Sequence, residues 1–268
     1  MKFTIVTVCW NAKSVIVSTI ESVLNQDFAD FEYLIIDGGS TDGTLSLIKE
    51  YENSFQKKRI PYRWISEKDK GIYDAMNKGA VNARGDYILY MNAGDKFFDY
   101  GVMRNFLNAT TNIIADAYYG NTMMHFYEGS GVYAETEGSK LNPTMPFIHQ
   151  SVIVRKELLI KHPFDVSFKV CADHEFFHWM REQQFVFQYC NFIVADYDAK
   201  EGFSENNPLT IQYELDKIYG RDKKSTYWFR RFVLRCTVGL IQPIKDIFPR
   251  VLLNKYFRAK KKYIKWVD

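Results

Sequence analysis

The residues with the clearest capacity for chemistry are acidic side chains in short polar segments that follow apolar runs. The segment "NAGD" ends the run "YILYM" with one amide, Asn92, and one carboxylate, Asp95. "IIDGGSTDGT" carries Asp37 and "SEKDKG" carries Asp69 in the same way. Each segment could be a simple turn or a loop that holds a charged ligand, and the elements around them must decide between the two.

A further acidic segment, "KVCADHEFF", places Asp173 and Glu175 at the start of a predicted helix, with His174 and His178 nearby. One carboxylate beside an acceptor hydroxyl can serve as a general base. A structural zinc site is not expected, because the two histidines lack the H-E-x-x-H pattern.

The glycines of "IIDGGSTDGT" do not have the G-x-G-x-x-G spacing of dinucleotide-binding proteins, and they follow the second predicted strand instead of the first. This argues against a nicotinamide or flavin enzyme. At the end of the strand, Asp37 is predicted to contact a ligand, either a base or a ribose. Asp42 is predicted only to shape the turn and cap the next helix.

The segment "EKDKGIYDAMNKG" gathers Asp69, Asp74, Asn77 and Lys78 around Gly71. A glycine permits close approach of a ligand to the backbone, and the last three polar residues fall within about one helical turn. Ordinary solvated helix charge is the alternative, and for Lys78 alone it is the better interpretation.

The elements that position these residues alternate between strand and helix. The predicted strands are "KFTIVTVCW", "FEYLIID", "PYRWIS" and "DYILYM", and the predicted helices are "SVIVSTIESVLNQ", "TLSLIKEYENSF" and "IYDAMNKGAVNA". Asn11 or Ser14 is the expected cap of the first helix. This order predicts a parallel sheet in three layers, with ligands bound at the carboxyl ends of the strands. The loops Asp37–Asp42, Glu67–Gly71 and Asn92–Asp95 should therefore converge on one edge.

The second half is less regular. Its predicted elements are a strand in "AYYGNTMMHF", a hairpin or mobile loop in "YEGSGVYAETEGSK", a strand entering a helix in "FIHQSVIVRKELL", a helix in "FKVCADHEFFHWMREQ" and a strand pair in "FVFQYCNFIVADYDAKEGFS".

Composition and charge divide the 268 residues unevenly. Hydrophobic residues make up 47%, enough for a packed core. The net charge of +3 combines +11 from residue 221 onward with −8 before it. We therefore expect a domain over 1–220 and a basic amphipathic extension over 221–268, where Trp and Phe alternate with Arg and Lys. Such an extension suits an anionic membrane surface, or alternatively a helical brace packed on the core; no groove-reading motif indicates nucleic acid.

The four cysteines are scattered, and neither a signal segment nor a membrane-spanning run is evident. The expected location is cytoplasmic, peripheral on the inner face of the cytoplasmic membrane.

Five segments together resemble family 2 glycosyltransferases. They occur in the family's order over residues 1–205: "TIVTVCWN", "IIDGGSTDGT", "DKGIYDAMNKGAVNARGDYILYMNAGD", "HQSVIVRKELL" and "FKVCADHEFF". The chain looks most like the branch that includes colanic-acid-type exopolysaccharide transferases. The resemblance implies the α/β GT-A fold of nucleotide-diphospho-sugar transferases, a Rossmann-like, mostly parallel sheet in three α/β/α layers, here followed by the basic helical extension.

The resemblance also implies an activity: transfer of a hexosyl or N-acetylhexosaminyl group, with inversion, to a hydroxyl of a glycan or polyprenyl-linked glycan in bacterial surface polysaccharide synthesis. The donor would be a nucleotide sugar, UDP more than GDP, and Asp173 matches the catalytic base. The residues expected to bind the donor are Val8, Asp37, Asp69, Gly71, Asp74, Asn77, Lys78, Asn92 and Asp95. Those expected on the acceptor side are His149, Gln150 and Glu175.

The chain departs from the family at the loop that normally binds a divalent cation. "NAGD" stands where "DADD" is usual, so the expected ligands of Mg²⁺ or Mn²⁺ are reduced to Asp95 and the carbonyl oxygen of Asn92. Fewer anionic ligands predict weaker, more donor-dependent metal binding. Met76 also replaces a usual arginine, and Lys78 could supply part of the missing charge.

The alternative function is a catalytically weak nucleotide- or sugar-binding protein whose altered metal loop reflects lost activity. The presence of Asp173 argues against it.

Overall fold

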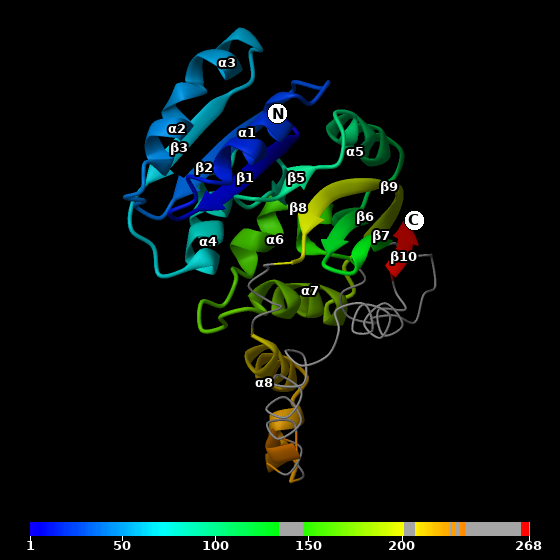
Figure 1. Cartoon of the computed structure of the whole chain (residues 1–268). Coiled ribbons are helices and arrows are strands. Elements are labelled where there is room, and N and C mark those ends of the chain that lie inside the picture. The colour runs from blue at the N-terminus through cyan, green and yellow to red at the C-terminus, as the bar shows by residue number, and fades with distance from the viewer. Residues whose placement is uncertain (134–146, 201–206, 226, 229–230, 234–263, 268) are drawn as a thin grey trace.

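The computed structural model describes residues 1–133, 147–200, 207–225, 227–228, 231–233 and 264–267 (Figure 1). Its first half contains four parallel strands in the order β3-β2-β1-β4: β1 Phe3–Cys9, β2 Phe31–Asp37, β3 Tyr62–Ser66 and β4 Tyr87–Tyr90. All residues of β1, β2 and β4 are buried, as expected for apolar strands covered on both faces. The register aligns Cys9, Asp37 and Ser66, so these strands end at a common edge.

Helices cover both faces of this sheet, which confirms the predicted three layers. Alternate residues of β1 divide between two cores: Ile5 packs with α1, α2, α3 and α5, whereas Val6 packs with α4, α6 and α7. The helices are α1 Ile16–Leu24, α2 Thr44–Glu50, α3 Glu52–Lys57, α4 Ile72–Asn82, α5 Val102–Asn112, α6 Lys156–Lys161 and α7 Ala172–Glu182.

Two local predictions in this half were wrong. The single helix expected over "TLSLIKEYENSF" is divided into α2 and α3 at Tyr51. Neither Asn11 nor Ser14 caps α1, whose N-cap is Val15 without a side-chain hydrogen bond. Instead Asn11 adopts a positive φ of 47° and its side-chain oxygen accepts from the Thr41 N–H, which ties the loop after β1 to the loop after β2.

The second half makes the sheet mixed instead of mostly parallel. β8 (Val152–Arg155) runs antiparallel to β4, and β6 (Ala117–Phe126) runs antiparallel to β8. β6 forms a hairpin with β7 (Gly129–Tyr133), which agrees with one of the two alternatives predicted for residues 127–140; residues 134–146 lie outside the described chain.

The strand pair expected over residues 185–204 is one long strand, β9 (Phe187–Asp198). It runs parallel to β6, with register shifts near Asn121, and its end pairs antiparallel with β5 (Lys96–Phe97). β9 therefore links the first half of the sheet to the second, and residues 201–206 are outside the described part.

Most of the predicted basic extension also lies outside the described residues. α8 (Pro208–Ile218) lies beneath α7 in Figure 1, and a 3₁₀ turn, η2 (Arg221–Lys223), follows it. The last described segment, β10 (Ile264–Val267), is a strand and pairs antiparallel with β7, so this end of the predicted helical extension belongs to the sheet. Within the described ranges, no helix has the length and apolarity needed to cross a membrane.

The close approach of Gly85 to β1 gives a test of the sheet packing. A Cβ atom at Gly85 would lie 2.5 Å from the carbonyl carbon of Phe3 and 2.6 Å from the nitrogen of Thr4, both backbone atoms. We expect Gly85→Ala to destabilise the fold by about 1–3 kcal/mol, measured as a lower thermal midpoint. Gly101→Ala is the matched control, because its Cβ would meet nothing closer than Asp99 Oδ1 at 3.4 Å. Equal midpoints for the two variants would contradict this packing.

Candidate active site

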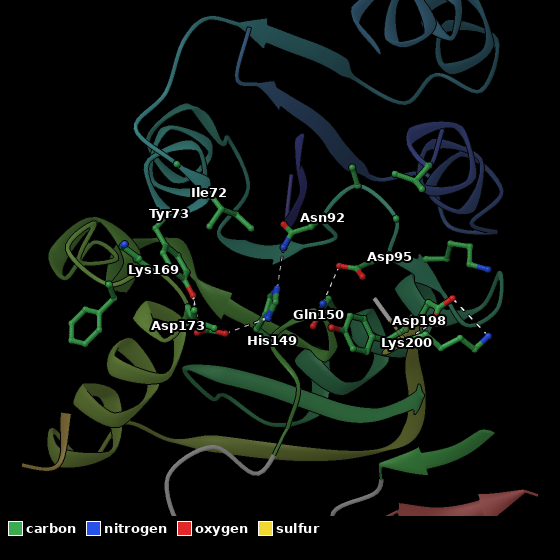
Figure 2. A pocket seen from close by; sticks show the side chains of 18 of the residues that line it. Ile72, Tyr73, Asn92, Asp95, His149, Gln150, Lys169, Asp173, Asp198 and Lys200 are labelled. Atoms are coloured by element: carbon green, nitrogen blue, oxygen red, sulfur yellow. Dashed lines mark hydrogen bonds and ion pairs between the residues drawn. The ribbon is translucent and has the colours of Figure 1, made fainter. Parts of the chain in front are cut away.

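A cavity of about 1270 Å³ opens where the predicted polar segments meet (Figure 2). The loop after β4 contributes Asn92 and Asp95, and the start of α4 contributes Gly71 to Asp74. The 3₁₀ turn η1 (His149–Ser151) contributes His149 and Gln150, and the first turn of α7 contributes Asp173. The cavity thus collects side chains from these four parts of the sequence and from several others.

A hydrogen-bonded chain of three residues crosses the cavity wall (Figure 2). The Asn92 amide nitrogen lies 3.1 Å from His149 Nε2, and His149 Nδ1 lies 3.3 Å from Asp173 Oδ2. Because the amide nitrogen can only donate, Nε2 accepts and the proton of the neutral imidazole sits on Nδ1, facing Asp173. The hydrogen bonds from Asn92 to His149 and from His149 to Asp173 therefore orient the Asp173 carboxylate toward His149.

The electrostatics of this pair favour an ionised Asp173. Burial alone would raise the pKa of Asp173, but the hydrogen bonds from His149 and from the N–H of His174 hold it below the usual range. Burial alone would likewise lower the pKa of His149, but Asp173 outweighs it and raises that pKa. A carboxylate that is ionised at neutral pH and lines a cavity can accept a proton from a bound hydroxyl.

Two further groups fix the position of the Asp173 carboxylate. The His174 N–H donates to Asp173 Oδ1 at 2.9 Å. The Tyr73 hydroxyl, from α4, lies 3.2 Å from the same oxygen and 2.5 Å from the Val170 carbonyl oxygen. Burial and the Asp173 charge raise the pKa of Tyr73, so its hydroxyl stays protonated and can donate.

The loop after β4 and the neighbouring turn η1 together offer oxygen ligands that suit a hard divalent cation. The buried side-chain oxygens of Asn92 and Gln150 have no hydrogen-bond partner among the described residues, and Asp95 adds a carboxylate that accepts from Gln150 Nε2 at 3.0 Å. Within the described ranges, no cluster of three or more His, Cys, Asp or Glu could hold a metal by itself. Oxygen ligands with a single carboxylate match a cation that shares its coordination with substrate phosphates.

Burial raises the pKa of Asp95 to about 6, although His149 and Gln150 oppose the shift. A cation beside the carboxylate would offset this cost of burial and keep Asp95 ionised.

The structure brings just over half of the sequence-predicted residues to the cavity. Those that line it are Gly71, Asp74, Asn92, Asp95, His149, Gln150 and Asp173. Those outside the lining are Val8, Asp37, Asp69, Asn77, Lys78 and Glu175. The expected convergence of three loops is thus only partly realised in this cavity, because the loop after β2 does not line it.

Several residues outside the lining are occupied by protein partners. The buried Asp37 carboxylate accepts from Ser66 Oγ at 2.6 Å and from the Ser40 N–H at 3.1 Å. Lys78 bonds Glu67 at 2.9 Å, and Glu175 bonds His162 at 3.1 Å.

The other three residues outside the lining are also held within the protein. Val8 is buried in β1 and its carbonyl accepts from the Ala93 N–H at 3.1 Å. Asp69 accepts from the Gly71 N–H at 2.9 Å. Asn77 exchanges two hydrogen bonds with the Phe164 backbone, which ties α4 to the segment before α7.

The sequence interpretation missed residues that the structure places at the site. Tyr73 contacts Asp173 directly, and Lys70 and Lys169 line the cavity without an ion pair to any described residue. His125 and Asp196 also line the cavity, with His125 Nε2 2.8 Å from Asp196 Oδ1. Only Tyr73 and Lys70 had a signal, because both belong to the polar segment after β3; the others come from elements whose placement is not local in sequence.

Comparison with known proteins gives the family and the fold. Residues 4–173 match the profile described as Glycosyl transferase family 2. The PGL/p-HBAD biosynthesis glycosyltransferase of Mycobacterium bovis is 27% identical over 208 residues, covering 75% of this chain and 78% of that protein. The putative teichuronic acid biosynthesis glycosyltransferase TuaG of Bacillus subtilis is 32% identical over 93 residues, covering 35% and 36%.

Solved structures have the same fold at low identity. TarS 1–349 of S. aureus in complex with UDP superposes with a TM-score of 0.60 and 17% identity, over 81% of this chain and 64% of that one. The mannosyltransferase PcManGT of Pyrobaculum calidifontis, in complex with GDP-Man and Mn²⁺, gives 0.64 and 13%, over 82% and 63%. The chain therefore spans somewhat less than two thirds of each of these structures.

These likenesses confirm the predicted GT-A fold, while the resemblance to the colanic-acid-type branch stays a prediction. The profile covers most of the parallel half of the sheet, the loop after β4 and the 3₁₀ turn η1, and it ends at Asp173. The chain belongs to glycosyltransferase family 2.

Proposed function

We propose that this chain is an inverting glycosyltransferase that moves a sugar from a nucleoside-diphosphate sugar to a hydroxyl of a glycan or lipid-linked glycan. The observation that carries the proposal is Asp173, an ionised carboxylate held by His149 and Tyr73 at the cavity wall. Further support comes from relatives named for PGL/p-HBAD and teichuronic acid biosynthesis and from fold neighbours solved with UDP, UDP-GlcNAc or GDP-Man.

In the proposed reaction, Asp173 accepts the proton of the acceptor hydroxyl as its oxygen attacks the anomeric carbon of the donor. The new carbon–oxygen bond forms on the face opposite the nucleotide, while the bond from the anomeric carbon to the diphosphate oxygen breaks. The nucleoside diphosphate leaves with the bonding electron pair, and the configuration inverts. His149 stabilises the negative charge of Asp173 before the transfer and keeps the carboxylate pointed at the hydroxyl.

The leaving diphosphate requires positive charge, and the cavity offers two sources of it. Lys70 and Lys169 line the cavity. When bound at Asp95 and Asn92, Mg²⁺ or Mn²⁺ would neutralise diphosphate charge. Lys78, which the sequence suggested as a further source of positive charge, is held by Glu67 and Asp74 and contributes less directly.

The residues that line the cavity also suggest where the donor and the acceptor would bind. We place the nucleotide toward the loop after β3, where Lys70 and Gly71 line the cavity, with UDP the preferred nucleotide and GDP the second choice. We place the acceptor toward His149 and Gln150, from where the cavity continues to Tyr127 and Lys200.

A membrane-bound acceptor would suit the basic chain beyond residue 220. Among its described residues, Trp228 is 73% and Phe232 66% exposed, and Arg231 lies over the Trp228 ring. We propose that this segment contacts an anionic lipid surface, because aromatic and cationic side chains together favour the headgroup region.

The first test is Asp173→Asn. The amide cannot accept a proton at neutral pH, so we expect the transfer rate to fall about a hundredfold to ten-thousandfold, while nucleotide affinity in calorimetric titration changes little. Glu182→Gln, which changes an exposed carboxylate on the same helix, is the control. Unchanged turnover in Asp173→Asn would favour the alternative, a binding protein without this catalysis.

The second test is titration of UDP and GDP with and without Mn²⁺. We expect UDP to bind more tightly than GDP and Mn²⁺ to strengthen its binding, because the oxygens of Asp95 and Asn92 can share the cation with the diphosphate. Asp95→Asn should abolish most of the gain from Mn²⁺, whereas Asp86→Asn, at the other end of β4, should preserve it. Binding that is equally tight without Mn²⁺ would assign the diphosphate to protein cations such as Lys169.

The third test is co-sedimentation of the full chain with lipid vesicles. We expect binding to vesicles containing phosphatidylglycerol and little binding to phosphatidylcholine alone, with the difference reduced at high salt. Replacing Trp228 and Phe232 together by alanine should weaken the binding. Equal sedimentation with both kinds of vesicle would contradict an anionic lipid contact.

A further inference from the structure

A buried glutamate on α8 holds the chain immediately before the proposed general base. Glu214 is a carboxylate only 4% exposed. Its carboxylate accepts three backbone N–H bonds: from Lys169 at 2.7 Å, from Val170 at 3.0 Å and from Cys171 at 2.8 Å. A carboxylate satisfied by three consecutive amides fixes the path of that segment closely.

These amides directly precede the first turn of α7, whose N-cap residue makes no capping bond. The N-cap residue of α7 is Cys171, which makes no side-chain capping bond. Helices usually receive such a bond from a Ser, Thr, Asp or Asn at the N-cap. Here Glu214, 43 residues beyond Cys171 in the sequence, adds a carboxylate from a different helix to Asp173 and Glu175 in the first turn of α7 itself. It also lies beside the positive end of the α7 dipole.

The same segment is held from its other side by α4. The Val170 N–H donates to Glu214, and the Val170 carbonyl accepts from the Tyr73 hydroxyl, which also contacts Asp173. The backbone at Val170 is thus held by α8 through its N–H and by α4 through its carbonyl oxygen. Asp173 follows Val170 by three residues, so the clamp sets where its carboxylate leaves the backbone.

We propose that Glu214 is a positioning residue for Asp173, and that α8 therefore belongs to the catalytic unit although it lies beyond the family match. The proposal rests on the proposed function, in which Asp173 is the general base. Glu214 does not line the cavity and touches no substrate; it acts through residues 169–171. A purely structural role, in which Glu214 only attaches α8 to the domain, is the competing explanation.

Kinetics of Glu214→Gln and Glu214→Ala separate the two roles. The glutamine has one oxygen in place of two and turns an N–H group toward backbone donors, so the clamp loosens without a large loss of volume. We expect kcat to fall about tenfold to a hundredfold, because small displacements of a reacting group cost about that much, while KM for the donor and UDP affinity stay near the wild-type values. Glu214→Ala should show a larger fall in kcat.

Asp216→Asn is the matched control. It removes a carboxylate from the same helix, where Asp216 bonds Arg221 at 2.9 Å, and it leaves residues 169–171 untouched. Its kcat should stay near the wild-type value. Thermal midpoints of all variants are measured alongside, to show that each remains folded at the assay temperature. An equal fall in kcat for Asp216→Asn and Glu214→Gln would overturn the proposal, because general docking of α8 would then explain both.

The imidazole of His149 gives a readout that does not need turnover. Its Nδ1 proton faces Asp173, so ¹⁵N-edited NMR of the full chain should show a downfield, slowly exchanging signal, identified by its absence in His149→Gln. We expect that signal to shift or exchange faster in Glu214→Gln and to persist in Asp216→Asn. An unchanged signal in a folded Glu214→Gln variant would refute the positioning role.

The two measurements also separate this proposal from the proposed function. Absence of nucleotide binding and of transfer in the wild-type chain would defeat the proposed function, and the His149 signal would still decide whether Glu214 fixes Asp173. Normal wild-type transfer with an unchanged kcat in Glu214→Gln would defeat the positioning role alone.

Discussion

The hydrogen-bonded chain from Asn92 through His149 to Asp173 is the constraint on which the rest of the site depends. It joins the end of β4, the turn before β8 and the first turn of α7, which belong to different halves of the sequence. The pairing of β8 with β4 brings His149 within reach of Asn92, and Tyr73 connects α4 to Asp173. The cavity is therefore a consequence of how the antiparallel half of the sheet closes against the parallel half.

The parallel half was predictable because its signals are local. Buried strands such as β1 and β2 are continuous apolar runs, and each is followed by a helix with an apolar face. The antiparallel half was not predictable in the same way. Whether residues 187–198 form one strand or two depends on their pairing with β6 and β5, which the sequence of β9 does not encode by itself.

The same distinction separates the site residues that were predicted from those that were not. Asn92, Asp95 and Asp173 stand at strand or helix ends in polar segments, where a ligand site is expected from topology alone. Lys78 and Glu175 have the right types, but Glu67 and His162 engage them, and neither partner is evident before the chain is folded. Glu214 gave no signal, because an acidic residue on an amphipathic helix is usually solvated.

Asn92 also changes how the departure from the usual "DADD" loop should be understood. An aspartate at position 92 could only accept a hydrogen bond, so it would require a proton on Nε2 of His149. The asparagine instead donates to Nε2, which leaves the proton of the neutral ring on Nδ1 and directed at Asp173. At the same time, the amide oxygen of Asn92 has no hydrogen-bond partner in the described part of the chain. One residue can thus serve the proposed base through its nitrogen and a cation through its oxygen, so the loss of a carboxylate here is compatible with a working site.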